Sequence, residues 1–119
     1  MAKIYREEGV ATRMVMEQFF ETHEGKQRKR MELTSNEAVK QAVIAGLGIS
    51  VMPLIGMRNE LINQDIFILP SNDFPIKTDW RIIWLRGKKL SPVSQAFLEF
   101  IKSEKQNILD KHFKWYLTY

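Results

Sequence analysis

Residues 34–53 read TSNEAVKQAVIAGLGISVMP, and this stretch decides the fold. Small apolar side chains recur through it at helical spacing, and Ser35 or Asn36 supplies a side-chain oxygen that caps such a helix at its N-terminus. Gly46 suits the left-handed position that follows a helix, and residues 49–52 form a short apolar run of strand type. The stretch therefore predicts a capped helix that leads directly into a strand.

The residues before this stretch predict two more strands and another helix. Residues 3–6 and 30–33 are short runs of β type, and each ends at a turn or a helix start. Between them, residues 12–22 carry apolar side chains on one helical face, and Thr12 is a suitable N-cap. Strands that alternate with helices are typical of parallel α/β structures, so we expect a short, mostly parallel sheet flanked by helices.

The residues after it extend the pattern. A short helix is expected over residues 54–61, a buried strand over 66–69 and a long strand over 78–86, where apolar residues dominate both faces. Ser91 precedes a proline at the first position of a further helix, which is a typical helix start. We expect the tail at residues 104–119 to extend that helix.

Composition limits the class of protein. The chain has 119 residues, of which 45% are hydrophobic and 27% charged, and its net charge is +4. This is the composition of one globular domain. Cysteine is absent, and the only histidines, His23 and His112, are far apart, so neither a disulfide nor a metal site is expected. No stretch is long and apolar enough for a membrane span, so we expect a cytoplasmic protein without membrane contact.

The sequence carries no motif for catalysis. The run from Gly46 to Gly48 ends a helix and enters a strand, which is the reverse of the polarity of a phosphate-binding loop. Ser50 and Ser91 lack the flanking glycines of a nucleophile elbow, and no histidine and aspartate are placed to activate them. We therefore expect a protein that is not an enzyme and that uses no cofactor.

One pattern predicts a ligand site. In open parallel sheets, ligands bind beyond the carboxyl ends of the strands, where helix N-termini direct free N–H groups toward an anion. Thr12 and Arg13 follow the first predicted strand, and Ser35 and Asn36 follow the second, so we expect these four residues to bind one small anion. The alternative is purely structural: the hydroxyls cap helices and Arg13 pairs with Glu17 one turn later.

Three stretches resemble the effector-binding domain of LysR-type bacterial transcriptional regulators. Residues 6–13 read REEGVATR and are similar to the family's Arg-Glu-x-Gly-Ser-Gly-Thr-Arg turn, although Val10 and Ala11 replace the usual Ser-Gly. Residues 35–53 resemble the family's helix, Gly-x-Gly and strand, and residues 80–101 resemble its returning strand and last helix. The chain is also similar to family members that regulate carbon fixation.

The resemblance implies a periplasmic-binding-protein-like (type 2) fold, in which a small anionic metabolite lies between two α/β subdomains. Residues 1–78 would form the second regulatory subdomain, residues 79–103 a strand and helix that return toward the first, and residues 104–119 a C-terminal tail. The family implies a homo-oligomer, with the strand and helix at residues 31–45 at the dimer contact. It also implies DNA binding through an N-terminal winged helix-turn-helix, which we expect to be absent from this chain.

Two other functions are compatible with such a fold. The chain could be part of a small-molecule solute-binding protein, although its first residues lack the apolar segment of a signal peptide. A small enzyme is the third alternative, and no residue pattern calls for it. We therefore expect the ligand-sensing portion of a transcriptional regulator.

Overall fold

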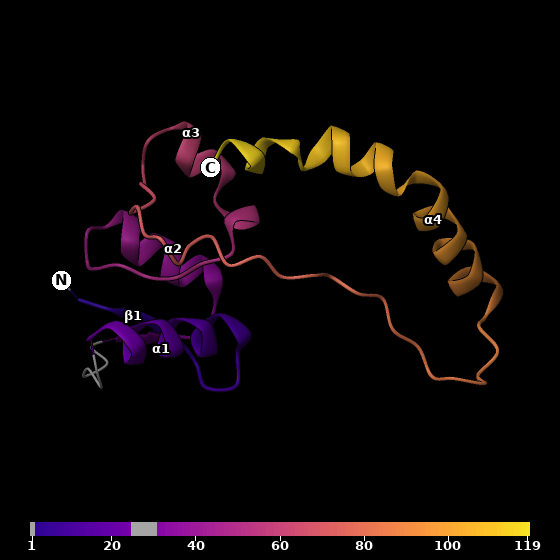
Figure 1. Ribbon diagram of the computed structural model, residues 1–119, viewed down its shortest axis with the longest axis horizontal. Coiled ribbons are helices and arrows are strands. Elements are labelled where there is room, and N and C mark those ends of the chain that lie inside the picture. The colour runs from indigo at the N-terminus through magenta and orange to yellow at the C-terminus, as the bar shows by residue number, and fades with distance from the viewer. Residues whose placement is uncertain (1, 25–30) are drawn as a thin grey trace. The chain divides into compact units, whose positions relative to one another are not determined.

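The computed structural model describes residues 2–24 and 31–119, and the chain divides into two compact units, Met1–Ile68 and Leu69–Tyr119. The elements of the first unit are β1 (Ile4–Arg6), α1 (Ala11–Glu24), β2 (Met31–Leu33), α2 (Asn36–Ile44), the 3₁₀ turn η1 (Leu54–Gly56) and α3 (Arg58–Ile62) (Figure 1). The second unit contains α4 (Pro92–His112) and the 3₁₀ segment η2 (Lys114–Thr118).

A parallel strand pair forms the centre of the first unit. β1 and β2 pair in parallel, with Ile4 opposite Met31 and Arg6 opposite Leu33. On the other side of β1, Lys3 forms a parallel bridge with Ile49, and the Ile4 N–H donates to the Ile49 carbonyl at 2.9 Å. The α/β class and the parallel pairing predicted from the sequence are confirmed.

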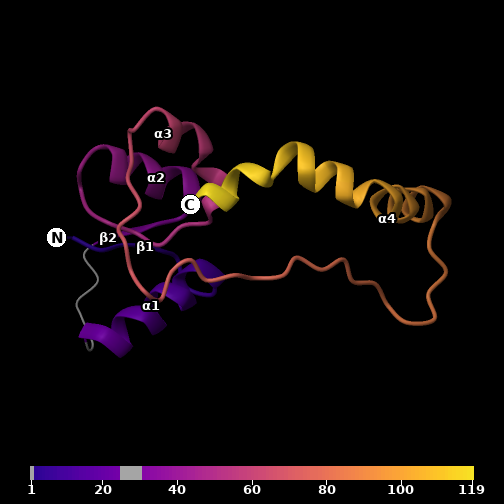
Figure 2. The same cartoon turned by 45° about the horizontal axis from the view of Figure 1, so that its top comes forward.

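Helices α1 and α2 cover opposite faces of this strand pair (Figure 2). Ile4 is fully buried and packs with Val39 of α2, whereas its neighbour Tyr5 packs with Met16 and Phe20 of α1. Because successive side chains of a strand point to opposite faces, the three residues of β1 contribute side chains to two separate hydrophobic clusters. β1 is thereby fixed between the two helices.

Helix α2 begins and ends where the sequence predicts. Ser35 is its N-cap, and the Ser35 hydroxyl oxygen accepts a hydrogen bond from the Ala38 N–H at 3.0 Å. Gly46 follows the C-cap with φ of +74°, and its N–H donates to the Val43 carbonyl at 2.9 Å. Glycine adopts this left-handed conformation without the steric cost that a Cβ would add.

Two predicted helix boundaries were wrong. α1 begins at Ala11, so Thr12 lies inside the first turn and is not the N-cap. The Val10 carbonyl already accepts hydrogen bonds from the Arg13 and Met14 N–H groups. The helix therefore begins directly after Val10, before the position predicted from the sequence. The helix expected over residues 54–61 is divided at Met57 into η1 and α3.

The strand predicted over residues 30–33 is confirmed over the residues described, whereas two others form only in part or not at all. Residue 30 lies outside the described residues, and β2 is observed from Met31. Within residues 49–52 only Ile49 bridges to another strand, and residues 66–69 contain no strand. Ile66 is buried, but the three residues that follow it are exposed. An apolar run becomes a strand only when a second backbone pairs with it, and the described part of the chain offers none here.

The second unit contains an extended segment followed by a long helix. Residues 78–86 are not a strand, contrary to expectation, and Trp80 and Ile83 are each more than 80% exposed. The predicted start of α4 is confirmed, because the Ser91 hydroxyl oxygen accepts from the Ser94 N–H at 3.2 Å. The helix continues to His112 and so extends through the first part of the predicted tail, but residues 114–118 form the 3₁₀ segment η2 instead. No helix among the described residues is long and apolar enough to cross a membrane.

Candidate functional site

The two predicted ligand-binding segments lie at the same edge of the strand pair. Since β1 and β2 run in parallel, their carboxyl ends meet at this edge. The chain leaves β1 to enter α1 near Thr12 and Arg13, and it leaves β2 to enter α2 at Ser35 and Asn36. The structure therefore brings all four predicted residues to one side of the sheet, from two helix N-termini.

Arg6, the last residue of β1, connects these segments. Its guanidinium donates to both carboxylate oxygens of Glu7, from Nε at 2.7 Å and from Nη2 at 2.9 Å. Nη1 donates to the Asn36 side-chain oxygen, and Nη2 donates to the Thr34 carbonyl at 3.4 Å. The side chain is only 13% exposed. Sequence reasoning placed Arg6 in the family-like turn but did not assign it to the site.

Arg13 is buried, and acidic side chains surround it. Its Nε lies 2.7 Å from a Glu17 oxygen, its Nη1 2.7 Å from a Glu32 oxygen and its Nη2 3.5 Å from a Glu8 oxygen. The hydrogen bond that Arg13 donates to Glu17 is the main cause that raises the pKa of Arg13, and the one that it donates to Glu32 adds to the effect. The structural alternative for Arg13, a pair with Glu17, is thus present. A ligand anion would have to share this guanidinium with three carboxylates.

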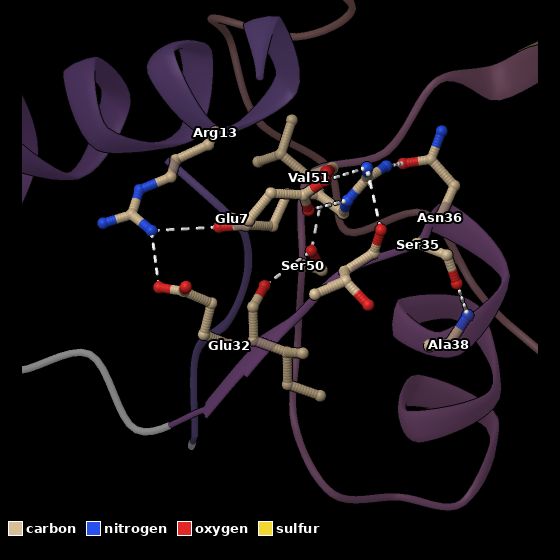
Figure 3. A network of polar contacts seen from close by, with 11 residues as sticks. Glu7, Arg13, Glu32, Ser35, Asn36, Ala38, Ser50 and Val51 are labelled. Carbon is tan, nitrogen blue, oxygen red and sulfur yellow. Dashed lines mark hydrogen bonds and ion pairs between the residues drawn. The ribbon is translucent and has the colours of Figure 1, made fainter. Parts of the chain in front are cut away.

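Ser35 and Asn36 present hydrogen-bond donors at the α2 end (Figure 3). The Ser35 oxygen accepts from Ala38, which leaves the hydroxyl proton as a donor. The Asn36 oxygen faces the Arg6 guanidinium, and the amide nitrogen points away from it. The backbone N–H groups of Asn36 and Glu37 lie in the first turn, where a helix has no internal acceptor for them. This end of the site offers several uncharged donors.

Thr12 contributes a different feature. Its hydroxyl oxygen is buried and has no hydrogen-bond partner among the described residues. Buried hydroxyls in native proteins nearly always bond to protein or water, and an unpaired one is a group that a bound water or ligand atom satisfies. The described residues include no group of three or more His, Asp or Glu side chains that could hold a metal ion.

Comparison with known proteins decides the family. Residues 4–106 match the LysR substrate binding domain. The chain belongs to this family. It is 44% identical over 98 residues to the HTH-type transcriptional activator CmpR of Synechocystis, an alignment that covers 82% of this chain and 32% of that protein. The resemblance of the sequence to LysR-type regulators is confirmed.

Other relatives have related names. The chain is 45% identical over 101 residues to the RuBisCO operon transcriptional regulator of Allochromatium vinosum, covering 85% of this chain and 33% of that protein. It is 38% identical over 100 residues to the HTH-type transcriptional regulator CbbR of Rhodospirillum rubrum, covering 84% and 34%. The chain therefore spans about a third of the length of these relatives. By name, these relatives are transcriptional regulators.

The ion pair between Arg6 and Glu7 in this LysR-type domain predicts an unusual titration. The hydrogen bonds from the Arg6 guanidinium lower the pKa of Glu7 from 4.5 to about 2, and a backbone hydrogen bond adds to the effect. Because the pKa is lowered in the folded state, the pair stabilises the fold fully above pH 4.5, and this stabilisation is lost as the pH falls toward 2.

Carbon-detected NMR of the Glu7 carboxyl group should therefore give a midpoint near 2. In an Arg6→Gln variant the midpoint should rise toward 4.5, the ordinary value. A wild-type midpoint near 4.5 would show that the Arg6–Glu7 pair does not persist in solution.

Proposed function

We propose that this chain is the ligand-sensing part of a LysR-type transcriptional regulator, and that it binds a small anionic metabolite at the N-termini of α1 and α2. The observation that carries the proposal is the convergence of these two helix ends on residue 6, at the carboxyl edge of a parallel strand pair. In the full-length protein, ligand binding would regulate transcription.

The donors at this edge support an oxygen-rich ligand. Ser35 and Asn36 offer side-chain donors, the first turn of α2 adds backbone N–H groups, and the buried Thr12 oxygen lacks a partner. Arg6 and Arg13 add little free charge, since Glu7 and the carboxylates around Arg13 compensate both. Solvent-screened helix-end contacts contribute roughly 0.3–1 kcal/mol each, so this half of a site gives millimolar affinity at best, about −4 kcal/mol.

We also propose how the chain is used in the whole regulator. Residues 1–78 form the second regulatory subdomain, residues 79–103 return toward the first subdomain, and residues 104–119 are a tail. The exposure of Trp80, Ile83 and Leu85 supports this arrangement, since an apolar extended segment is stabilised by a neighbouring strand. The regulator would be a cytoplasmic homo-oligomer that contacts DNA through a winged helix-turn-helix.

The proposal is tested by adding phosphate, sulfate and small carboxylates to the chain while the backbone amide signals are followed by NMR. The amides of Thr12, Arg13, Ser35 and Asn36 should shift together, with one midpoint in the millimolar range. A variant that combines Ser35→Ala and Asn36→Ala should lose this common response, because two of the donors are removed.

The same anion titration can also contradict the proposed site. The α4 lysines Lys102, Lys105 and Lys111 are exposed, and exposed cations attract anions without forming a site. Shifts confined to these lysines would mean that the ends of α1 and α2 only cap helices, and the proposed site would be wrong.

A further inference from the structure

We propose that Arg6 is the positioning residue of this site: it fixes the Asn36 amide with its donor end toward the ligand and ties the first turns of α1 and α2 to the end of β1. The inference deepens the proposed function and rests on it for the role of Asn36 as a ligand contact. Arg6 itself is not proposed to touch the ligand.

The side chain of Arg6 forms the link to α2. Asn36 is 30 residues away in sequence, yet its side-chain oxygen accepts from Nη1 of Arg6, and the Thr34 carbonyl accepts from Nη2. The two hydrogen bonds to Glu7 hold the plane of the guanidinium in place. A planar guanidinium has five N–H donors and can bind a carboxylate, an amide and a carbonyl at the same time. A lysine ammonium has its donors on a single nitrogen atom and cannot reach all three groups.

The backbone of Arg6 forms the link to α1. The Arg6 carbonyl accepts a hydrogen bond from Nη1 of Arg13 at 3.0 Å, and the same Nη1 pairs with Glu32 of β2. Residue 6 is therefore bonded to the first turn of α1 through its carbonyl and to the first turn of α2 through its guanidinium. These bonds link the first turns of α1 and α2, in addition to the packing of both helices against β1.

The orientation of Asn36 has a chemical consequence. An amide presents either an oxygen or two N–H groups to a neighbour, and rotation about its last bond exchanges the two. Because Arg6 has only donors, it binds the Asn36 oxygen and directs the amide nitrogen the opposite way (Figure 3). The side of Asn36 that faces away from Arg6 is thereby a donor, which suits the oxygens of a carboxylate or a phosphate.

Two variants test the inference, with inorganic phosphate as the probe. Arg6→Lys keeps the charge but removes the planar group of donors, so the three-bond couplings between Asn36 Hβ and Nδ2, which report χ2, should change from those of one rotamer to an average. Phosphate should then bind about fivefold more weakly, as for the loss of one ordered hydrogen bond. Asn36→Asp keeps the acceptor for Arg6 and removes both N–H donors, so folding should be retained and phosphate binding should fall about tenfold or more.

The control is Arg81→Lys, since Arg81 is exposed, lies in the other unit and pairs only loosely with Asp79 at 3.3 Å. It should change neither the Asn36 couplings nor phosphate binding. If Asn36 keeps a single rotamer in Arg6→Lys, or if Asn36→Asp binds phosphate as wild type does, the inference is wrong. If phosphate shifts neither helix end in the wild type, the proposed function fails, while the Asn36 couplings still decide whether Arg6 positions that side chain.

Discussion

Replacing Met16 with alanine should lower the free energy of unfolding by about 2–5 kcal/mol. Met16 lies in the middle of α1, is only 1% exposed, and packs with Tyr5 and Phe20 against β1. Truncation removes buried apolar area and leaves a cavity in the core between α1 and β1. Because a domain of this size is stabilised by only about 5–15 kcal/mol, much of the stability would be lost.

The same helix provides a matched control. Met14 is two residues away and 63% exposed, so Met14→Ala should change the unfolding free energy by no more than about 0.5 kcal/mol. Urea unfolding followed by circular dichroism measures both variants. Equal effects of the two substitutions would contradict the placement of α1 against β1.

Replacing Gly48 with alanine should be the other strongly destabilising change, by about 1–3 kcal/mol. A Cβ at this position would lie 2.2 Å from the carbonyl oxygen of Ala2, which is far inside van der Waals contact. Since that carbonyl accepts from the Ile49 N–H at 2.8 Å, the chain would have to separate here. The pairing of Lys3 with Ile49 would weaken as a result.

Gly56 is the matched control for Gly48. No atom lies within 4 Å of a Cβ built there, and its φ is not in the left-handed region. Gly56→Ala should therefore leave the thermal unfolding midpoint within a few degrees of the wild-type value, whereas Gly48→Ala should lower it clearly. A Gly48→Ala protein as stable as wild type would show that residues 2 and 48 do not approach each other so closely.

The parts of the fold that depend on local chemistry could be predicted from the sequence. Ser35 caps α2 and Gly46 ends it because a hydroxyl and a missing Cβ act within a few residues of their own position. Ser91 starts α4 for the same reason. The helix boundary at Thr12 was misplaced, since the carbonyl of Val10, two residues earlier, already serves as the acceptor.

Strands could not be predicted in the same way. The alternating apolar side chains of residues 78–86 are typical of a strand. A strand forms, however, only if another backbone pairs with it. No such partner is found for this segment in the described chain, and Trp80 and Ile83 remain exposed. β1 and β2 form strands because their backbones pair with each other in parallel.

The candidate site also combines features that are local in sequence with one that is not. Thr12, Arg13, Ser35 and Asn36 could be named because helix starts after strands are recognisable in sequence. The role of Arg6 could not, because its contact with Asn36 joins residues 30 positions apart. One signal was available: an arginine that ends a strand before a Glu-Glu-Gly turn is placed to reach the neighbouring strand's helix.

We propose that Asn36 donates a hydrogen bond to an oxygen-rich ligand between the two helix ends. The most direct measurement is the NMR shift of the two Asn36 side-chain amide protons during a phosphate titration. We expect a downfield shift whose midpoint equals that of the Thr12 backbone amide. Side-chain protons that stay unshifted while phosphate saturates the chain would contradict it.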